Sequence, residues 1–215
     1  MEYRTTGQHS ISVHYDSWMD GGGTWFGLDY ISVIRDRYLN RQFDHCLEWC
    51  SGPGFIGFEL LDHGICECLC LTDIYTPAID RAQQTIQHLP EVYQHRVSAY
   101  ATPSVSGLPI TKQFDLVVAN PPHFLECPGD DNIQRIKVDT NWAAHRDFFF
   151  NIKRHLMPNG VVLLQENQAG SLKREQEFAD DIDRAGLQIT AVFDSKHYYT
   201  PDDHTQIYYI EICHQ

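Results

Sequence analysis

The stretch HCLEWCSGPGFIGFELL, residues 45–61, decides the fold class. It opens with a short apolar run, turns at a group of glycine and proline residues, and continues with the apolar spacing of a helix. A strand that passes through such a turn into a helix is the first part of a βα unit. We therefore expect this stretch to begin a parallel sheet with crossover helices.

The same alternation continues toward the C-terminus. A second βα unit starts at CECLCL (66–71) and passes into a helical stretch in which Pro77 suits the first turn. Further strand-like runs lie at 96–102, 114–119 and 160–165, and a helical stretch lies at 142–156. The chain thus has the element order of an α/β protein.

The two strand-like runs at the end of the chain differ from the others. LQITAVF (187–193) and TQIYYIEIC (205–213) have no helix between them, so we expect them to pair antiparallel. The sequence predicts an α/β, Rossmann-like fold with a seven-stranded, mostly parallel sheet, an antiparallel last strand and helices on both faces.

Composition excludes several classes of protein. The 215 residues include no apolar run of the ~20 residues that cross a bilayer, and the start MEYRTTGQHS lacks the order of a signal peptide. Seven cysteines are an odd number in a chain too long to need disulfides. We expect a soluble cytoplasmic protein without membrane association. The net charge of −13 repels polyphosphates, so nucleic acid is disfavoured as a partner.

A glycine-rich motif lies where the first strand turns into the first helix. GPGFIG (52–57) matches the G-x-G-x-x-G pattern that lets a ligand approach bare backbone, and Asp73 follows at the distance of a ribose-binding acid. Both a dinucleotide and another nucleoside cofactor fit this pattern, and a plain turn is the alternative without function. Glu48 ahead of the loop would repel a pyrophosphate and attract an ammonium group.

A second motif, FDLVVANPPHF (114–124), closes the fourth strand at the edge of the sheet where ligands bind in open α/β folds. Its two prolines fix φ and remove two N–H donors. An asparagine amide and a proline carbonyl are then left as acceptors. A Pro-Pro loop after an edge strand is the alternative without function, and we favour a functional role.

On these residues the sequence resembles the class I S-adenosylmethionine-dependent methyltransferases. It is similar to the branch with an Asn-Pro-Pro-aromatic motif, which includes HemK-type glutamine methyltransferases and exocyclic-amine nucleobase methyltransferases. The resemblance covers roughly residues 18–215 and is carried by EWCSGPGFIG, LTDIYTPAIDRA, FDLVVANPPHF and HRDFFFNIKRHLMPNGVVLL. Cys50 stands where many relatives have glycine.

The resemblance implies the residues of the site. The expected cofactor-binding residues are Glu48, Cys50, Ser51, Gly52, Gly54, Asp73, Ile74, Thr102 and Asn120, and the cofactor is S-adenosyl-L-methionine. The expected catalytic residues are Asn120, Pro121, Pro122 and His123, and Phe124 is expected to contact the substrate. Asp139, Asn141 and Trp142 follow a loop of a kind that commonly shapes substrate pockets, and Trp142 is therefore also expected to contact the substrate. Residues 1–41, with the glycine cluster DGGGTW and a helical run, are too short for a domain and are expected to be a leader that caps the cofactor site. Residues 42–215 are expected to form the methyltransferase domain.

Two positions depart from the pattern of the branch. The acidic residue expected after the third strand is absent, because only Thr102, Pro103 and Ser104 stand there. The fourth residue of the second motif, usually aromatic, is His123, which can stack on a planar group or accept a proton. Contacts to adenine and the role of His123 are therefore open.

The chemistry of methyl transfer explains the second motif. An amide or arylamine nitrogen has a delocalised lone pair and is a poor nucleophile. Two acceptors, the Asn120 side chain and the Pro121 carbonyl, would hold its N–H groups, favour a pyramidal nitrogen and stabilise the charge that develops on it. The sequence thus predicts transfer to nitrogen.

The predicted function is S-adenosylmethionine-dependent N-methylation of a protein side chain or a small molecule. Alternatives are an enzyme acting on exocyclic amines of rRNA, tRNA or DNA, and a cofactor-binding subunit without activity. No metal is expected, because Cys66, Cys68 and Cys70 share one strand face with no matching Cys/His group nearby in sequence. The oligomeric state is left open.

Overall fold

The computed structural model of the protein describes residues 1–39, 41–200 and 205–215, with the side chains of 197–200 and 205 excepted. The chain divides into two compact units, Met1–Pro103 and Ser104–Gln215. The leader predicted at residues 1–41 is part of the first unit, and its role as a cap stays a prediction.

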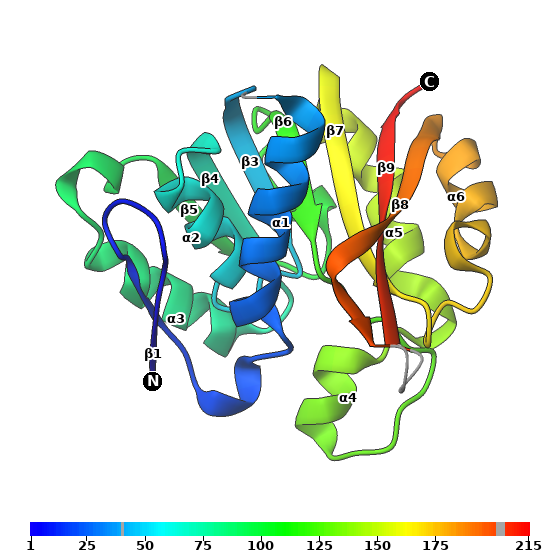
Figure 1. The fold of residues 1–215 in the computed structure, drawn as a ribbon, viewed down its shortest axis with the longest axis horizontal. Coiled ribbons are helices and arrows are strands. Elements are labelled where there is room, and N and C mark those ends of the chain that lie inside the picture. Colours follow the sequence, from blue (N-terminus) through cyan, green and yellow to red (C-terminus); the bar gives the residue numbers. More distant parts are fainter. Residues whose placement is uncertain (40, 201–204) are drawn as a thin grey trace. The chain divides into compact units, whose positions relative to one another are not determined.

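The first unit holds three parallel strands in the order β5-β4-β3, with helices following β3 and β4 (Figure 1). Its elements from residue 43 on are β3 (Phe43–Trp49), α2 (Phe55–Asp62), β4 (Cys66–Asp73), α3 (Thr76–Gln87), the 3-10 turn η2 (Glu91–Tyr93) and β5 (Val97–Ala101). Pro77 lies in the first turn of α3, as its fixed φ and missing N–H allow. Both predicted βα units are confirmed.

The first 39 residues form a hairpin and a helix. These elements are β1 (Glu2–Arg4), β2 (Ser12–His14), the 3-10 turn η1 (Ser17–Met19) and α1 (Gly23–Tyr38), with β1 and β2 antiparallel. The glycine cluster begins α1: Gly22 has φ of 101° and its N–H donates to Asp20 Oδ1 at 2.9 Å. Gly27 gives α1 its close approach to α2, since a Cβ there would lie 2.8 Å from the Glu59 side chain.

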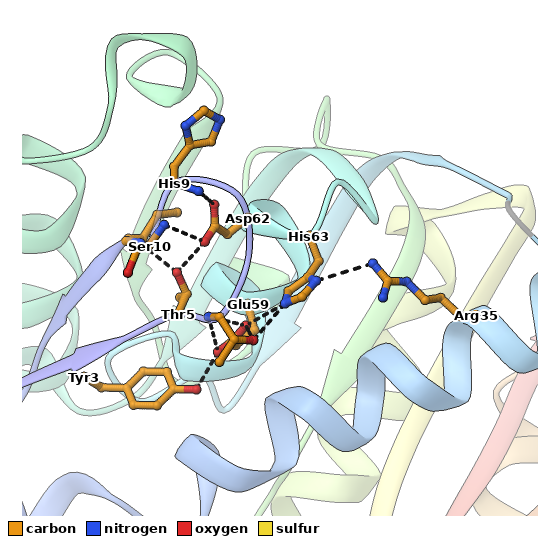
Figure 2. A network of polar contacts seen from close by, with 10 residues as sticks. Tyr3, Thr5, His9, Ser10, Arg35, Glu59, Asp62 and His63 are labelled. Atoms are coloured by element: carbon orange, nitrogen blue, oxygen red, sulfur yellow. Dashed lines mark hydrogen bonds and ion pairs between the residues drawn. The ribbon is translucent and has the colours of Figure 1, made fainter.

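Two buried carboxylates of α2 hold the N-terminal hairpin in place (Figure 2). Asp62 accepts hydrogen bonds from Thr5 Oγ1 at 2.6 Å, His9 N at 2.8 Å and Ser10 N at 3.1 Å. Glu59 accepts from the Tyr3 hydroxyl and from the backbone N–H and hydroxyl of Thr6. We call Tyr3, Thr5, Thr6, His9, Ser10, Glu59 and Asp62 the N-terminal network.

The second unit holds four strands in the order β6-β7-β9-β8, and β9 lies between β7 and β8 (Figure 1). Its strands are β6 (Phe114–Ala119), β7 (Leu156–Asn167), β8 (Leu187–Thr200) and β9 (Thr205–His214), and its α-helices are α4 (Asp131–Lys137), α5 (Ala143–Ile152) and α6 (Ala179–Arg184). The 3-10 turns are η3 (Val105–Gly107), η4 (Thr140–Trp142), η5 (Lys153–His155) and η6 (Arg174–Glu177). β6 and β7 are parallel, whereas β9 is antiparallel to both β7 and β8.

The predicted fold class is confirmed. In the described residues the strands β3 to β9 are the seven expected ones; they are mostly parallel, and the antiparallel β9 is the last in sequence. Several boundaries are wrong. The strand predicted at 187–193 is β8, which continues to Thr200. The helical stretch predicted at 142–156 ends as an α-helix at Ile152, and β7 begins at Leu156, earlier than the predicted 160. Leu156 pairs with Phe114 ahead of a β-bulge, and Pro158-Asn159-Gly160 lies inside the irregular start of the strand. In the part of the chain that the structure describes, no helix is long and apolar enough to span a membrane.

Candidate functional site

The glycine-rich loop between β3 and α2 has the backbone of a ligand cradle. Cys50, Gly52 and Gly54 all have positive φ, at 54°, 52° and 94°. A Cβ added to Gly52 would meet no atom within 4 Å, so its backbone is open to an approaching group. The left-handed conformation of Cys50 also explains why a glycine suits this position.

Asp73 ties this loop to the end of β4. Its Oδ2 accepts from Gly52 N at 2.7 Å, and its Oδ1 accepts from Tyr75 N at 2.8 Å. Burial raises the pKa of Asp73, while these backbone hydrogen bonds act in the opposite direction. The side chain is half-buried, so its outer edge can still receive a hydroxyl group.

Two further predicted residues lie beside Asp73. Ile74 is 68% exposed although it is large and apolar. Thr102, at the end of β5, donates its backbone N–H to the Asp73 carbonyl at 2.9 Å. The first unit therefore brings an open glycine backbone, a carboxylate and an exposed apolar side chain to the ends of neighbouring strands. This set fits a nucleoside with a polar tail.

Glu48 lies beneath the loop and does not offer a charge at the surface. It is 2% exposed, and its Oε2 accepts from Gly57 N at 2.7 Å in the first turn of α2. Burial raises the pKa of Glu48 to about 8, so the neutral acid predominates at pH 7. The expectation that its negative charge attracts an ammonium group therefore needs correction. Glu48 holds the start of α2 against β3.

In the second unit, β6 runs directly into Asn120-Pro121-Pro122-His123. The backbone of this motif is held from two sides. A Cβ on Gly170 would lie 1.7 Å from the His123 carbonyl oxygen, so only glycine allows this approach. Phe124 donates its N–H to the Lys137 carbonyl at 2.9 Å and is half-buried. The motif is thus a fixed loop.

A chain of polar side chains leads from this motif into the core of the second unit. His123 Nε2 lies 2.7 Å from Asn120 Oδ1, and His123 Nδ1 lies 3.3 Å from Glu166 Oε2. The other oxygen of Glu166 lies 2.8 Å from His145 Nε2, and His145 Nδ1 lies 2.7 Å from Asp139 Oδ2. We call Asn120, His123, Glu166, His145 and Asp139 the motif network.

The inner members of the motif network are charged although they are buried. Glu166 and His145 are both fully buried. Burial opposes the charge of His145, but the carboxylates of Glu166 and Asp139 outweigh it and raise the pKa of the imidazole to about 9. Burial likewise disfavours ionised Glu166, yet its pKa is lowered, mainly by His145. The pair is therefore an imidazolium and a carboxylate at neutral pH.

Aromatic rings enclose His145. Phe178 stacks on it with ring centroids 4.9 Å apart, and Trp142 meets it edge-on at 5.3 Å. Trp142 is 8% exposed, so most of its surface is used in this packing. Its predicted contact with substrate stays a prediction.

Sequence reasoning did not single out Glu166 or His145. Both are polar residues at positions where the hydrophobic pattern is apolar. Glu166 is a carboxylate at the end of the apolar run of β7, and His145 is a histidine on the buried face of α5. A buried polar residue needs a partner, and here each is the partner of the other.

The chain has the fold of the class I S-adenosylmethionine-dependent methyltransferases. The crystal structure of the glycopeptide N-methyltransferase MtfA matches it with a TM-score of 0.65, at 15% identity over 91% of this chain and 92% of that one. N-methyltransferase NodS from Bradyrhizobium japonicum WM9 matches with a TM-score of 0.57, at 16% identity over 91% and 98% of the two chains. Structures of MtfA with S-adenosylmethionine, sinefungin and S-adenosylhomocysteine are also similar.

One curated sequence is also similar: the tRNA1(Val) (adenine(37)-N6)-methyltransferase of Glaesserella parasuis serovar 5 (strain SH0165). It is 26% identical over 118 residues, which are 55% of this chain and 49% of the relative. The chain thus matches about half the length of that relative. No protein-family model matches the chain. The enzyme class predicted from the sequence agrees with both kinds of relative, and the predicted cofactor agrees with the ligands of the MtfA structures.

Proposed function

We propose that the protein is an S-adenosylmethionine-dependent N-methyltransferase that acts on an amide or amine nitrogen. The observation that carries this proposal is the Asn120-Pro121-Pro122-His123 loop, which leaves β6 with an asparagine amide at its head. Pro121 and Pro122 have no N–H groups, so the loop offers acceptors at this point. Acceptors suit a substrate that brings two N–H donors.

In this proposal the first unit binds the cofactor. The open backbone at Gly52 receives the methionine part, the half-buried Asp73 receives the ribose hydroxyls, and the exposed Ile74 covers the adenine. When bound, S-adenosylmethionine supplies an electrophilic methyl group. Glu48 acts through the loop, because its own carboxyl group is buried against Gly57.

The second unit handles the acceptor nitrogen. Asn120 and the Pro121 carbonyl accept its N–H groups, which orients the lone pair and stabilises the positive charge that forms. His123 lies against Asn120 and is available to stack on a planar group or to receive the proton that leaves. These roles account for each member of the motif.

The net charge of the protein favours one form of the proposal, in which the methyl acceptor is a protein side-chain amide or a small molecule. The net charge of −13 gives a phosphate backbone few cationic partners. The second candidate is an RNA exocyclic amine, which the curated relative favours because its name specifies adenine in tRNA. That relative weakens the sequence-based expectation that nucleic acid is disfavoured.

A transfer assay tests the proposal. Labelled S-adenosylmethionine and the full chain are incubated with separate protein, tRNA and metabolite pools, and label is followed in each. Label in the protein or metabolite pool supports the first form, and label in tRNA supports the second. Micromolar binding of the cofactor with no transfer to any pool would instead support a cofactor-binding subunit. Binding of a nicotinamide dinucleotide without S-adenosylmethionine binding would refute both forms.

A further inference from the structure

The motif network ends on the residue proposed to hold the acceptor nitrogen. Asn120 has an oxygen, which accepts, and an NH2 group, which donates, and a half-turn of its amide exchanges the two. His123 Nε2 lies 2.7 Å from Asn120 Oδ1, and a half-turn of the amide would put the NH2 group in that place. The state of His123 Nε2 therefore decides which end of Asn120 is left for the acceptor.

We propose that Glu166 is a positioning residue that holds a proton on His123 Nδ1 and thereby turns the oxygen of Asn120 toward the acceptor nitrogen. This inference rests on the proposed N-methyltransferase function. With its proton on Nδ1, a neutral His123 has a bare Nε2, which accepts from the NH2 group of Asn120. The Asn120 oxygen is then free.

The groups behind Glu166 make this arrangement stable. His145 Nδ1 donates to Asp139 and His145 Nε2 donates to Glu166, so the imidazole uses both of its protons. Glu166 is left as a fully buried carboxylate with one oxygen, Oε2, facing His123 Nδ1 at 3.3 Å. A carboxylate accepts and does not donate, so the proton is placed on the histidine nitrogen that faces it.

Protonation of His123 reverses the orientation of Asn120. Both ring nitrogens then donate, and the Asn120 oxygen must face the ring instead of the substrate. The titratable or charged groups around His123 are Glu166, with His145 and Asp139 behind it. Tyr208 of β9 also interacts with Glu166, and Arg174 of η6 lies over the Tyr208 ring, 4.5 Å from its centroid.

Nitrogen-15 NMR of the histidines in the full chain tests the inference without an assay of activity. We expect the proton of wild-type His123 to lie on Nδ1, which faces Glu166, and Glu166→Gln should move that proton to Nε2. The new amide gives its oxygen to the His145 N–H and turns its NH2 group toward His123. A wild-type His123 with its proton on Nε2, or charged at pH 8, would overturn the inference even if methyl transfer is found.

Kinetics supply the second arm. Glu166→Gln should lower kcat by about a hundredfold or more, the scale seen when a carboxylate no longer holds a catalytic histidine in the right tautomer. His123→Phe added to Glu166→Gln removes the competing ring N–H and should recover part of the loss. Glu91→Gln, an exposed control, should keep full activity. Unchanged kcat in Glu166→Gln would refute the inference.

The two kinds of failure are distinguishable. If no pool accepts a methyl group, the proposed function fails, and the NMR tautomer still tests the part of the inference that concerns His123. If Glu166→Gln does not fold, the tautomer of wild-type His123 decides alone.

Discussion

The N-terminal network and the motif network both hold buried carboxylates, and they differ in what those carboxylates accept. Asp62 accepts from one hydroxyl and two backbone N–H groups. Glu59 accepts from Tyr3 and Thr6, and His63 Nε2 also lies 3.4 Å from its Oε2, so the sharper contrast is between Asp62 and Glu166. Glu166 instead faces a histidine on each oxygen. Hydroxyl and backbone donors keep their protons across the physiological pH range, whereas imidazoles gain and lose theirs.

The two networks therefore differ in kind. The N-terminal network is a structural clamp, whereas the motif network contains partners that bind and release protons. Asp62 joins segments more than 50 residues apart and fixes the N-terminal hairpin on α2 through donors that are hydroxyl and backbone groups. Glu166 sets the donor and acceptor pattern of His123, which changes when the ring is protonated. Asp62 and Glu166 are both fully buried, so burial alone does not distinguish them, whereas the two histidine partners of Glu166 do.

The largest effect should come from replacing Asn120, the member of the motif network that is proposed to contact the acceptor, and it should be a loss of turnover. Asn120→Ala should lower turnover by about two to three orders of magnitude, because one preorganised contact to the developing charge is lost. Cofactor affinity should change little, since Asn120 is proposed to hold the acceptor nitrogen and the other proposed cofactor residues lie in the first unit. Steady-state kinetics and calorimetric titration measure the two quantities. Full activity of Asn120→Ala on the true acceptor would remove the motif from the catalytic site.

The next effect concerns the clamp. Asp62→Ala leaves a hydroxyl and two N–H groups without their acceptor and should lower the free energy of unfolding by about 3 kcal/mol. Turnover per folded molecule should not change. Urea denaturation measures the loss, with the exposed Asp80→Ala as the control that should match the wild type. Equal stability of the two variants would mean that the hairpin is not held by Asp62.

A pH series separates the two networks directly. The pKa of His145 is raised to about 9 from an ordinary value near 6.5, so the stability it adds is complete below about pH 6.5 and is lost as the pH rises through about 9. The stability deficit of His145→Gln should therefore shrink by about 2 to 3 kcal/mol between pH 6.5 and pH 10.

Asp62→Asn is the matched variant for this series, and its deficit should stay constant over the same range because its donors do not titrate. Urea denaturation at each pH measures both stability deficits. If the deficits of His145→Gln and Asp62→Asn changed with pH in the same way, the proposed difference between the two networks would be wrong.

The smallest effect concerns a third carboxylate, Asp73, which has fixed backbone donors like the clamp but an exposed edge. Asp73→Ala should weaken cofactor binding by about 1 to 2 kcal/mol through an unpaired ribose hydroxyl. Asp73→Asn, which keeps one acceptor, should lose less. Calorimetric titration gives both dissociation constants, and a wild-type value for Asp73→Ala would exclude this residue from the cofactor site.

Much of the fold follows from the sequence because its signals are local. The alternation of apolar runs and helical spacing predicts the strands around 45–49, 66–71 and 114–119, and the missing helix between 193 and 205 predicts the antiparallel pair. Turn chemistry locates the glycine-rich loop and the Pro-Pro loop. The start of β7 was missed because Pro158-Asn159-Gly160 has the composition of a turn but lies inside an irregular strand.

Only the tertiary structure decided what the polar side chains do. His123 meets Glu166 across 43 positions of sequence, Glu166 meets His145 across 21, and Thr5 meets Asp62 across 57. Glu48, which the sequence presents as a charge beside the loop, is instead a buried acid with a pKa of about 8. Backbone preference acts over a few neighbouring residues and is visible in sequence, whereas the protonation state and direction of a buried hydrogen bond depend on partners that only folding brings together.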